Sequence, residues 1–159
     1  MARLSIKGVN TLSQRFNKIA NMELRGTMNE ATKLVHGQAK ELAPVDTGDL
    51  AGSIHMQVKA SGDELQGRVY TNKEYAAYVE FGTGIKGNGT YPYKVEGLNL
   101  SYTDKGWAYF DEEKDEWIYT TGQVAQPYMY PALKDNEKAI RKMFKDGVHT
   151  RIKQNCEGN

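Results

Sequence analysis

The chain has 159 residues, which suits one ordinary domain with a single buried core. Apolar residues make up 39% and charged residues 26%, as in globular proteins with a well hydrated surface. Lys and Arg number 21 and Asp and Glu 20, so the net charge favours neither nucleic acid nor membrane as partner. The one cysteine, Cys156, allows no internal disulfide, and no apolar run reaches the ~18 residues of a membrane span. We therefore expect the chain to fold in the cytosol.

A long helical pattern opens the chain. Apolar residues recur at helical spacing, first at Leu12, Phe16 and Ile19, and after Gly26 at Met28, Ala31, Val35, Ala39 and Leu42. The pattern predicts one long helix, or two in tandem joined at Gly26, because Gly costs ~1 kcal/mol relative to Ala inside a helix. Pro44 lacks an amide hydrogen and disfavours helical geometry at Ala43. The helix is therefore predicted to end at Leu42.

Two strand patterns follow a turn. Asp46, Thr47 and Gly48 are turn residues, and Gly62-Asp63 marks a second turn. Between and after these turns apolar and polar residues alternate, over Ile54–Ala60 and again over Leu65–Thr71. The two runs predict an antiparallel hairpin that leads into the aromatic segment Tyr75–Phe81.

Periodicity is lost after Gly84, and we expect a long excursion from the core over residues 85–123. Its glycines predict a mobile loop at Gly82–Pro92. Two aromatic, β-prone runs, Trp107–Phe110 and Trp117–Thr120, flank an acidic stretch. They predict a second hairpin with a charged tip, held by two stacked aromatic pairs.

Pro127 and Pro131 precede a final helix of about 20 residues, for which Pro131 is a reasonable start. Its predicted apolar face carries Leu133, Ile140, Phe144 and Val148, and a basic stripe lies beside it, made of Lys134, Lys138, Arg141, Lys142 and Lys145. The local charge is +4 over Lys134–Lys153 and −4 over Asp104–Glu116. These are either two solvated faces or self-complementary patches for head-to-tail contacts between subunits.

Taken together, the patterns predict an α+β fold in one domain, residues 1–159. An antiparallel sheet would pack against the long N-terminal helix and the C-terminal helix, with the loop and hairpin excursion outside. Glu80 lies among apolar neighbours and needs a partner if it is buried. We expect that partner to be the backbone amides of residues 46–48 or the Thr47 hydroxyl.

Motifs for catalysis or cofactors are weak. Asp46-Thr47-Gly48 matches the short signature of aspartic proteases, but it follows a proline instead of an apolar strand and has no second copy. Gly82–Gly87 fits the dinucleotide-binding glycine pattern, yet no helix is predicted directly after it. The three histidines lack metal-ligand spacing. We therefore expect no enzyme activity and no cofactor.

Three segments in order carry a resemblance to a known family: Ala43–Ile54, Tyr75–Gly84 and Gln126–Leu133. Together they resemble the tail-completion, or head-tail joining, proteins of long-tailed bacteriophages. The resemblance extends from about Thr27 to Phe144. The segment Ile85–Gln123 departs from the commoner, shorter members.

The resemblance implies a non-enzymatic structural protein of the virion, at the neck or tail top, that is assembled in the host cytoplasm. It would form a ring, hexameric in such proteins, between the capsid connector and the tail tube or terminator. A nucleic-acid contact through the basic stripe, facing DNA in the ring lumen, is the alternative function. A maturation protease using Asp46 is a more remote one.

Two sets of residues carry these expectations. The motif residues that would hold the fold are Pro44, Asp46, Thr47, Gly48, Tyr75, Tyr78, Glu80, Phe81, Pro127 and Pro131. Among them, the aromatic residues Tyr75, Tyr78 and Phe81 are expected to fix the hairpin against the long helix. The residues expected to contact neighbouring subunits or the tail are Gly82, Thr83, Gly84, Lys86, Trp107, Trp117, Lys138, Arg141 and Lys142. Alternatively, Trp107 and Trp117 only staple their own hairpin.

Overall fold

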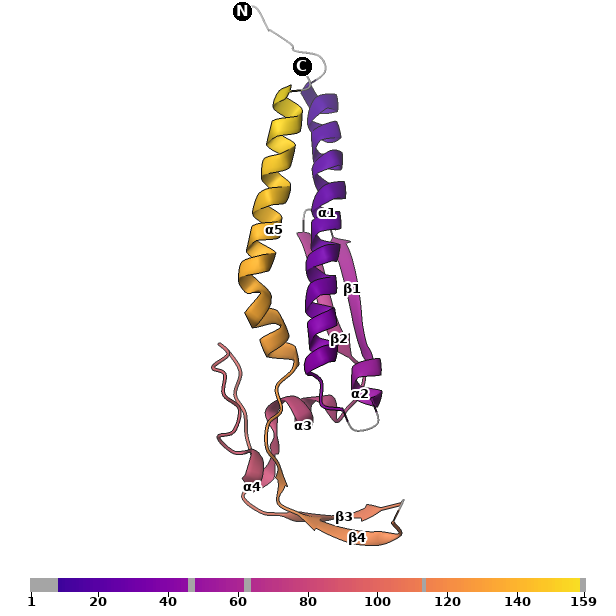
Figure 1. Cartoon of the computed structure of the whole chain (residues 1–159), viewed down its shortest axis with the longest axis vertical. Coiled ribbons are helices and arrows are strands. Elements are labelled where there is room, and N and C mark those ends of the chain that lie inside the picture. The colour runs from indigo at the N-terminus through magenta and orange to yellow at the C-terminus, as the bar shows by residue number, and fades with distance from the viewer. Residues whose placement is uncertain (1–8, 46–47, 62–63, 113, 158–159) are drawn as a thin grey trace, which may run out of the picture. The chain divides into compact units, whose positions relative to one another are not determined.

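A computed structural model of the chain describes residues 9–45, 48–61, 64–112 and 114–157 (Figure 1). In chain order the elements are α1 (Val9–Leu42), α2 (Asp49–Gly52), β1 (Ile54–Ser61), β2 (Glu64–Thr71), α3 (Ala76–Phe81), α4 (Gly84–Gly87), β3 (Trp107–Asp111), β4 (Glu116–Thr120), β5 (Gly122–Gln123) and α5 (Met129–Glu157). Helices and two separate two-stranded sheets confirm the α+β class. The chain divides into two compact units, considered in turn: Met1–Leu34 with Met56–Arg68 and Asn136–Asn159, and Val35–His55 with Val69–Asp135.

The long helix α1 is a single element. It runs through Gly26 without a break and ends at Leu42, two residues before Pro44. Of the two alternatives left by the sequence, the structure therefore has the single helix. Its end at the predicted residue follows from the restrictions that Pro44 places on its own amide and on Ala43.

In the first unit the hairpin of β1 and β2 packs against α1. Met56 and Val58 on β1 and Leu65 on β2 are half-buried, while the residues between them are exposed, as the alternation predicts. Ala60, predicted on the inner face, is exposed because it lies near the strand end. The predicted turn Gly62-Asp63 lies outside the described residues. Strand β2 and helix α1 approach each other closely at Gly67, where a Cβ added to the glycine would overlap the Thr32 hydroxyl.

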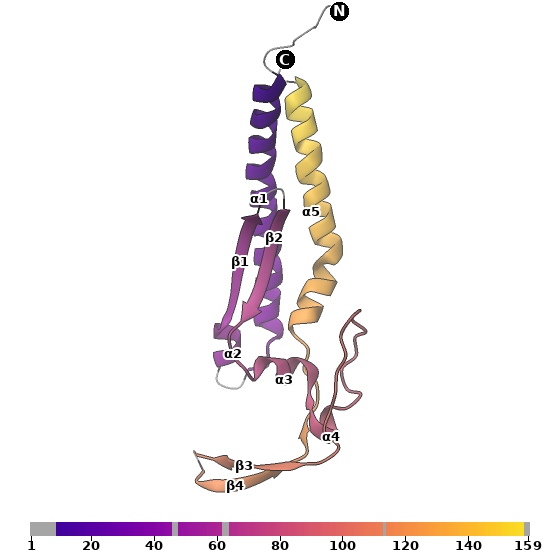
Figure 2. The same ribbon diagram turned by 180° about the vertical axis from the view of Figure 1, so that it is seen from behind.

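Helix α5 runs alongside α1 in the same unit, as both views show (Figures 1 and 2). A Cβ added to Gly147 would lie 3.1 Å from the Thr27 hydroxyl oxygen, so the two helices approach closely there. Ile140 and Phe144 are half-buried as predicted, but Val148 is 43% exposed. The predicted apolar face of α5 is wrong at Val148, because the buried stripe is rotated toward Met143 and Gly147.

The core of the second unit gathers small and aliphatic side chains around one tyrosine. Its buried apolar residues are Val35, Ala39, Ala43, Leu50, Ile54, Ala76, Tyr128 and Ala132. His36 has a structural role too, because its Nε2 lies within hydrogen-bond distance, 3.0 Å, of the Ile54 carbonyl oxygen. Leu133, which was predicted to face the core with Ile140, is 53% exposed. Its neighbours Pro131 and Ala132 are buried instead.

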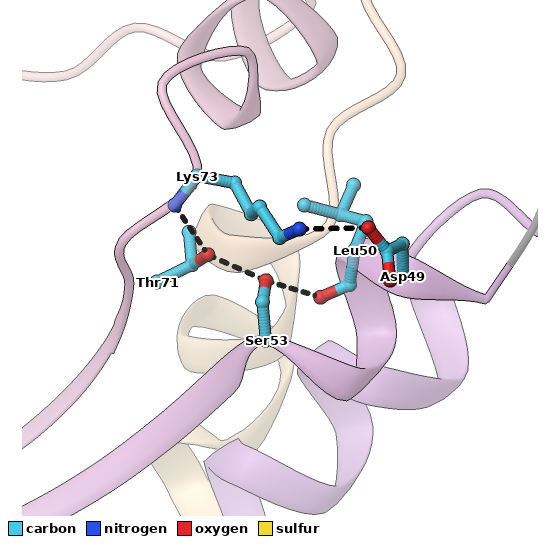
Figure 3. Close-up of polar contacts among 5 residues, drawn as sticks. All are labelled: Asp49, Leu50, Ser53, Thr71 and Lys73. Carbon is cyan, nitrogen blue, oxygen red and sulfur yellow. Dashed lines mark hydrogen bonds and ion pairs between the residues drawn. The ribbon is translucent and has the colours of Figure 1, made fainter.

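After Gly48 the chain forms a short helix, α2, which the strand and turn patterns did not predict. Gly48 precedes it with φ of 79°, a left-handed conformation that favours glycine. The Ser53 hydroxyl donates to the Leu50 carbonyl at 2.8 Å and lies 2.7 Å from the Thr71 hydroxyl (Figure 3). Lys73 Nζ donates to Asp49 at 2.7 Å, and this bond raises the pKa of Lys73. These contacts tie α2 to the end of β2.

The excursion carries the second predicted hairpin. Strands β3 and β4 pair antiparallel with Trp107 opposite Thr120 and Phe110 opposite Trp117, which confirms both aromatic runs as strands. The rings of Phe110 and Trp117 meet edge to face with centroids 5.7 Å apart. Of the two stacked aromatic pairs that were predicted, this is the one found among the described residues of the hairpin.

The base of the excursion is closed by hydrogen bonds. Thr83 bridges Gln123 and Gly84 bridges Gly122 in short antiparallel pairs. A Cβ on Gly82 would lie 2.7 Å from the Ala125 amide nitrogen, so two backbone segments touch where glycine leaves room. Gly82, Gly84 and Gly87 are buried. These glycines allow close packing of the backbone, a role that the sequence did not indicate.

We expect Gly67→Ala to lower the free energy of unfolding by about 1–3 kcal/mol, because the new methyl group must displace Thr32, whose hydroxyl donates to the Met28 carbonyl at 2.7 Å. The measurement is urea unfolding followed by circular dichroism. Gly37→Ala in α1 is the control: nothing lies within 4 Å of the added Cβ, so helix propensity should stabilise it. Equal effects of the two substitutions would contradict the packing of β2 on α1.

Candidate interaction surface

Glu80 of α3 caps the N-terminus of α5. One carboxylate oxygen accepts hydrogen bonds from the amides of Tyr128 at 2.7 Å and Met129 at 2.9 Å, and the other from Tyr130 at 3.1 Å. The first amides of a helix have no partner within the helix, and the helix dipole favours a negative charge there. Glu80 is buried, so these bonds compensate the loss of its hydration.

The sequence correctly indicated that a buried Glu80 needs partners, and it did not indicate the amides at the start of α5. The expected partners around residues 46–48 fall partly on Asp46 and Thr47, which lie outside the described residues. The carboxylate is instead taken up by amides 48 to 50 residues further along the chain. The signal in the sequence was Pro127 and Pro131, which mark the start of a helix whose amides need a cap.

A row of aromatic rings extends from Phe81 through the excursion to the start of α5. Centroids are 5.0 Å apart for Phe81 and Tyr91, 5.6 Å for Tyr91 and Tyr93, and 4.9 Å for Tyr93 and Tyr130. The Tyr102 hydroxyl adds a 2.8 Å bond to the Phe81 carbonyl. Sequence reasoning missed Tyr91 and Tyr93, because they lie in a stretch without periodicity.

The predicted cluster of Tyr75, Tyr78 and Phe81 does not form as expected. Tyr78 is 58% exposed and Tyr75 is also exposed, while Phe81 packs on Tyr91. The segment is helical, so positions 75, 78 and 81 lie toward one side, and the buried side is the other one, which carries Ala76 and Glu80. At the start of the final helix Tyr128 is buried in the core, and Tyr130 contacts Tyr93 of the excursion.

Beside this row lies an open pocket of about 690 Å³. Most of its wall is aromatic or small, and none of its lining residues carries a charge. The lining residues include Tyr75, Tyr78, Gly82, Thr83, Gly84, Tyr102, Trp107, Tyr109 and Gln123. Four of the residues predicted to contact partners meet here: Gly82, Thr83, Gly84 and Trp107.

The hairpin of β3 and β4 has two aromatic faces. Residues opposite each other in an antiparallel pair share a face, so Trp107 and Tyr109, which line the pocket, lie on one side. Phe110, Trp117 and Tyr119 lie on the other side, which we call the outer face. Trp117 is 72% and Tyr119 70% exposed. Trp117 thus packs on Phe110 within its hairpin and is still exposed enough to contact a partner. The two roles predicted for it, holding its own hairpin together and contacting a neighbour, are compatible.

The basic stripe of α5 is exposed, as predicted. Lys138, Lys142 and Lys145 make no ion pair with the described residues, and their spacing sets them along one side of the helix. Arg141 is different, since its guanidinium bonds Glu137 one turn earlier at 2.8 Å. Lys86, the remaining predicted contact residue, is exposed on α4.

Other kinds of site were also considered. Within the described ranges no three His, Cys, Asp or Glu side chains are grouped to hold a metal ion. Among the helices of the same ranges, none combines the length and apolarity needed to cross a membrane. Asp46, the residue of the protease alternative, lies outside the described residues.

We expect Glu80→Ala to lower the free energy of unfolding by about 2–3 kcal/mol, because three amides at the start of α5 lose their acceptor. Chemical denaturation measures the change. Glu30→Ala, at an exposed position of α1, is the matched control and should stay within about 0.5 kcal/mol of wild type. An unchanged stability of Glu80→Ala would show that the cap contributes little.

We expect Tyr91→Phe to leave stability at pH 7 unchanged or higher, because the buried Tyr91 hydroxyl has no hydrogen-bond partner among the described residues. Burial, and then the charge of Glu80, raises the pKa of Tyr91 to about 12 from 10.0. The folded state therefore holds this proton where the unfolded chain loses it, so stability falls as pH rises from about 10 to about 12. Tyr91→Phe should make that fall shallower in denaturation at alkaline pH. A fall as steep as in wild type would contradict this.

A family model described as "Bacteriophage HK97-gp10, putative tail-component" matches residues 6–82. The match covers α1, the hairpin of β1 and β2, and α3 with Glu80. No curated protein and no solved structure matched the chain. The match supports the resemblance to phage tail proteins on the first of the three segments, Ala43–Ile54, and on the second as far as residue 82. Over residues 6–82, just under half of the chain, the protein is similar to the HK97-gp10-like family of bacteriophage tail components.

Proposed function

We propose that this tail component is a non-enzymatic protein of the virion that forms a ring, hexameric in the assembled particle, at the top of the tail. The ring would complete the tail tube and join it to the capsid connector. The observation that carries the proposal is the β3–β4 hairpin, whose outer face exposes Phe110, Trp117 and Tyr119. Large exposed aromatic patches are typical of protein interfaces.

The fixed base of the hairpin supports a role in assembly. The excursion is closed by the bridges of Thr83 and Gly84 to residues 122–123 and by the bond from the Gln126 amide to the Val79 carbonyl at 2.8 Å. A loop presented from a rigid base loses little conformational entropy on binding. The hairpin is therefore suited to hold a neighbouring subunit or a tail protein in a defined orientation.

The chemistry of the pocket also favours a structural role. Its walls are built mostly of tyrosine, tryptophan, threonine and glycine, with Val79, Ser101 and Gln123, and no carboxylate, imidazole, amine or thiol is among the lining residues. The commonest general acids and bases are therefore missing from the lining, and its titratable groups are tyrosine hydroxyls. The pocket instead offers flat rings and hydroxyl groups, which suit contacts with a protein segment.

Contact with DNA is a second candidate, favoured by the exposed lysines of α5. Lys138, Lys142 and Lys145 would face phosphates if α5 lined the ring lumen. Such binding should weaken steeply with salt, with a slope of about −0.9 in log–log form for each phosphate neutralised. Titration of duplex DNA at several salt concentrations tests this candidate.

We expect a chain in which residues 108–119 are replaced by Asn-Gly to fold but not to form rings. Trp107 and Thr120 are opposite each other, so a two-residue turn can close the strands while Trp107 keeps its place in the pocket. Light scattering over a concentration series and negative-stain imaging measure assembly, and circular dichroism checks folding.

The control for this replacement changes the neighbouring exposed loop, with Lys94→Ala and Glu96→Ala together. It should assemble as wild type does. Rings of the trimmed chain at wild-type concentrations would remove the hairpin from the proposal, and a wild-type chain without rings alone or on tails would refute the ring itself.

A further inference from the structure

The outer face of the hairpin lacks a cover among the described residues. Trp117 and Tyr119 are mostly exposed, and Phe110 is exposed beside them. A two-stranded sheet alone is only marginally stable in water, and its apolar side needs something to pack on. The strands themselves are short, five residues each. The geometry therefore calls for an outside partner on this face.

The rim of the hairpin indicates the charge of that partner. Glu112 and Asp115 in the turn, and Glu116 at the start of β4, are exposed and make no ion pair with the described residues, whereas Asp111 is held by Lys114. Glu116 is opposite Asp111 and so lies on the face of Trp107 and Tyr109, next to the turn. Ammonium groups bind carboxylates and also stack over Trp and Tyr rings, and the methylene stems of lysine cover apolar surface. A row of lysines thus matches both the rings and the carboxylates.

The α5 stripe has this composition. Lys138, Lys142 and Lys145 are exposed, and Val148 adds an exposed apolar group at the edge of the row. From Lys138 to Lys145 the helix rises about 10 Å, and a five-residue strand is about 17 Å long. One hairpin can therefore cover the whole stripe.

We propose that the outer face and acidic turn of one copy dock on the Lys138, Lys142 and Lys145 stripe of a second copy. The inference rests on the proposed ring and assigns its two contact surfaces. Because the two surfaces differ, the contact is head to tail, and repetition around an axis closes a ring. The pairing brings the local charge of −4 over Asp104–Glu116 of one copy against the local charge of +4 over Lys134–Lys153 of the next, and these two charges cancel.

Charge reversal tests the contact. One variant carries Glu112→Lys, Asp115→Lys and Glu116→Lys in the hairpin, and the other Lys138→Glu, Lys142→Glu and Lys145→Glu in α5. Each alone should raise the concentration needed for half-assembly at least about 10-fold by light scattering, because like charges then meet. An equimolar mixture of the two should assemble again, as should one chain carrying all six substitutions.

Two controls separate this contact from general effects of charge. Lys33→Glu with Lys59→Glu reverses exposed lysines elsewhere and should leave assembly unchanged. Thermal unfolding by circular dichroism should show each variant folded. Trp117→Ser with Tyr119→Ser should weaken assembly without changing its dependence on salt.

The outcomes are distinct. Rings that persist in both reversed variants overturn the assigned surfaces and leave the proposed ring standing. Loss of assembly that neither the mixture nor the combined chain restores also overturns them. If reversal in α5 abolishes duplex DNA binding but not self-association, the stripe is a DNA contact and the inference fails. Absence of wild-type rings, alone and on tails, refutes the proposed function itself.

Discussion

The carboxylate of Glu80 on the amides of Tyr128, Met129 and Tyr130 is the constraint on which the second unit depends. It joins a short helix to the start of a long one across nearly fifty residues of intervening chain. A buried charge without partners would cost several kcal/mol, and helix amides without an acceptor would add to that cost. Pairing them resolves both problems at once, and it brings the two ends of the excursion together.

Once those ends meet, local packing fixes the excursion between them. Glycines at positions 82, 84 and 87 let the outgoing and returning backbones touch, and the rings of Tyr91 and Tyr93 connect Phe81 to Tyr130. A long segment without periodicity thereby becomes a firm base. The β3–β4 hairpin extends from it with one aromatic face toward a pocket and the other bare. The ring proposed above would use this projection for contacts between copies.

Opposite charges are concentrated on different parts of the chain. Its total charge is close to zero, which excludes strong attraction to DNA or lipid by the whole chain. The local charges are opposite at the hairpin and along α5, and both are exposed. Opposite patches on one chain favour ordered, head-to-tail contacts over random association, because like patches repel. In a chain that matches a phage tail family, these opposite patches are the physical basis of the contact proposed above between copies.

The sequence by itself determined the elements whose signal is local: the end of α1 before Pro44, the alternation of β1 and β2, the aromatic strands β3 and β4, and a final helix after two prolines. It also indicated that Glu80 needs a partner. Three features became known only from the tertiary structure: the partners of Glu80, the buried side of α5, and the close backbone packing that glycines 82, 84 and 87 allow at the base of the excursion. Those outcomes depend on contacts between residues far apart in the chain, where periodicity carries no information. Tyr78 shows the difference, since its aromatic character suggested the core, yet its position on α3 opposite Ala76 and Glu80 places it at the surface.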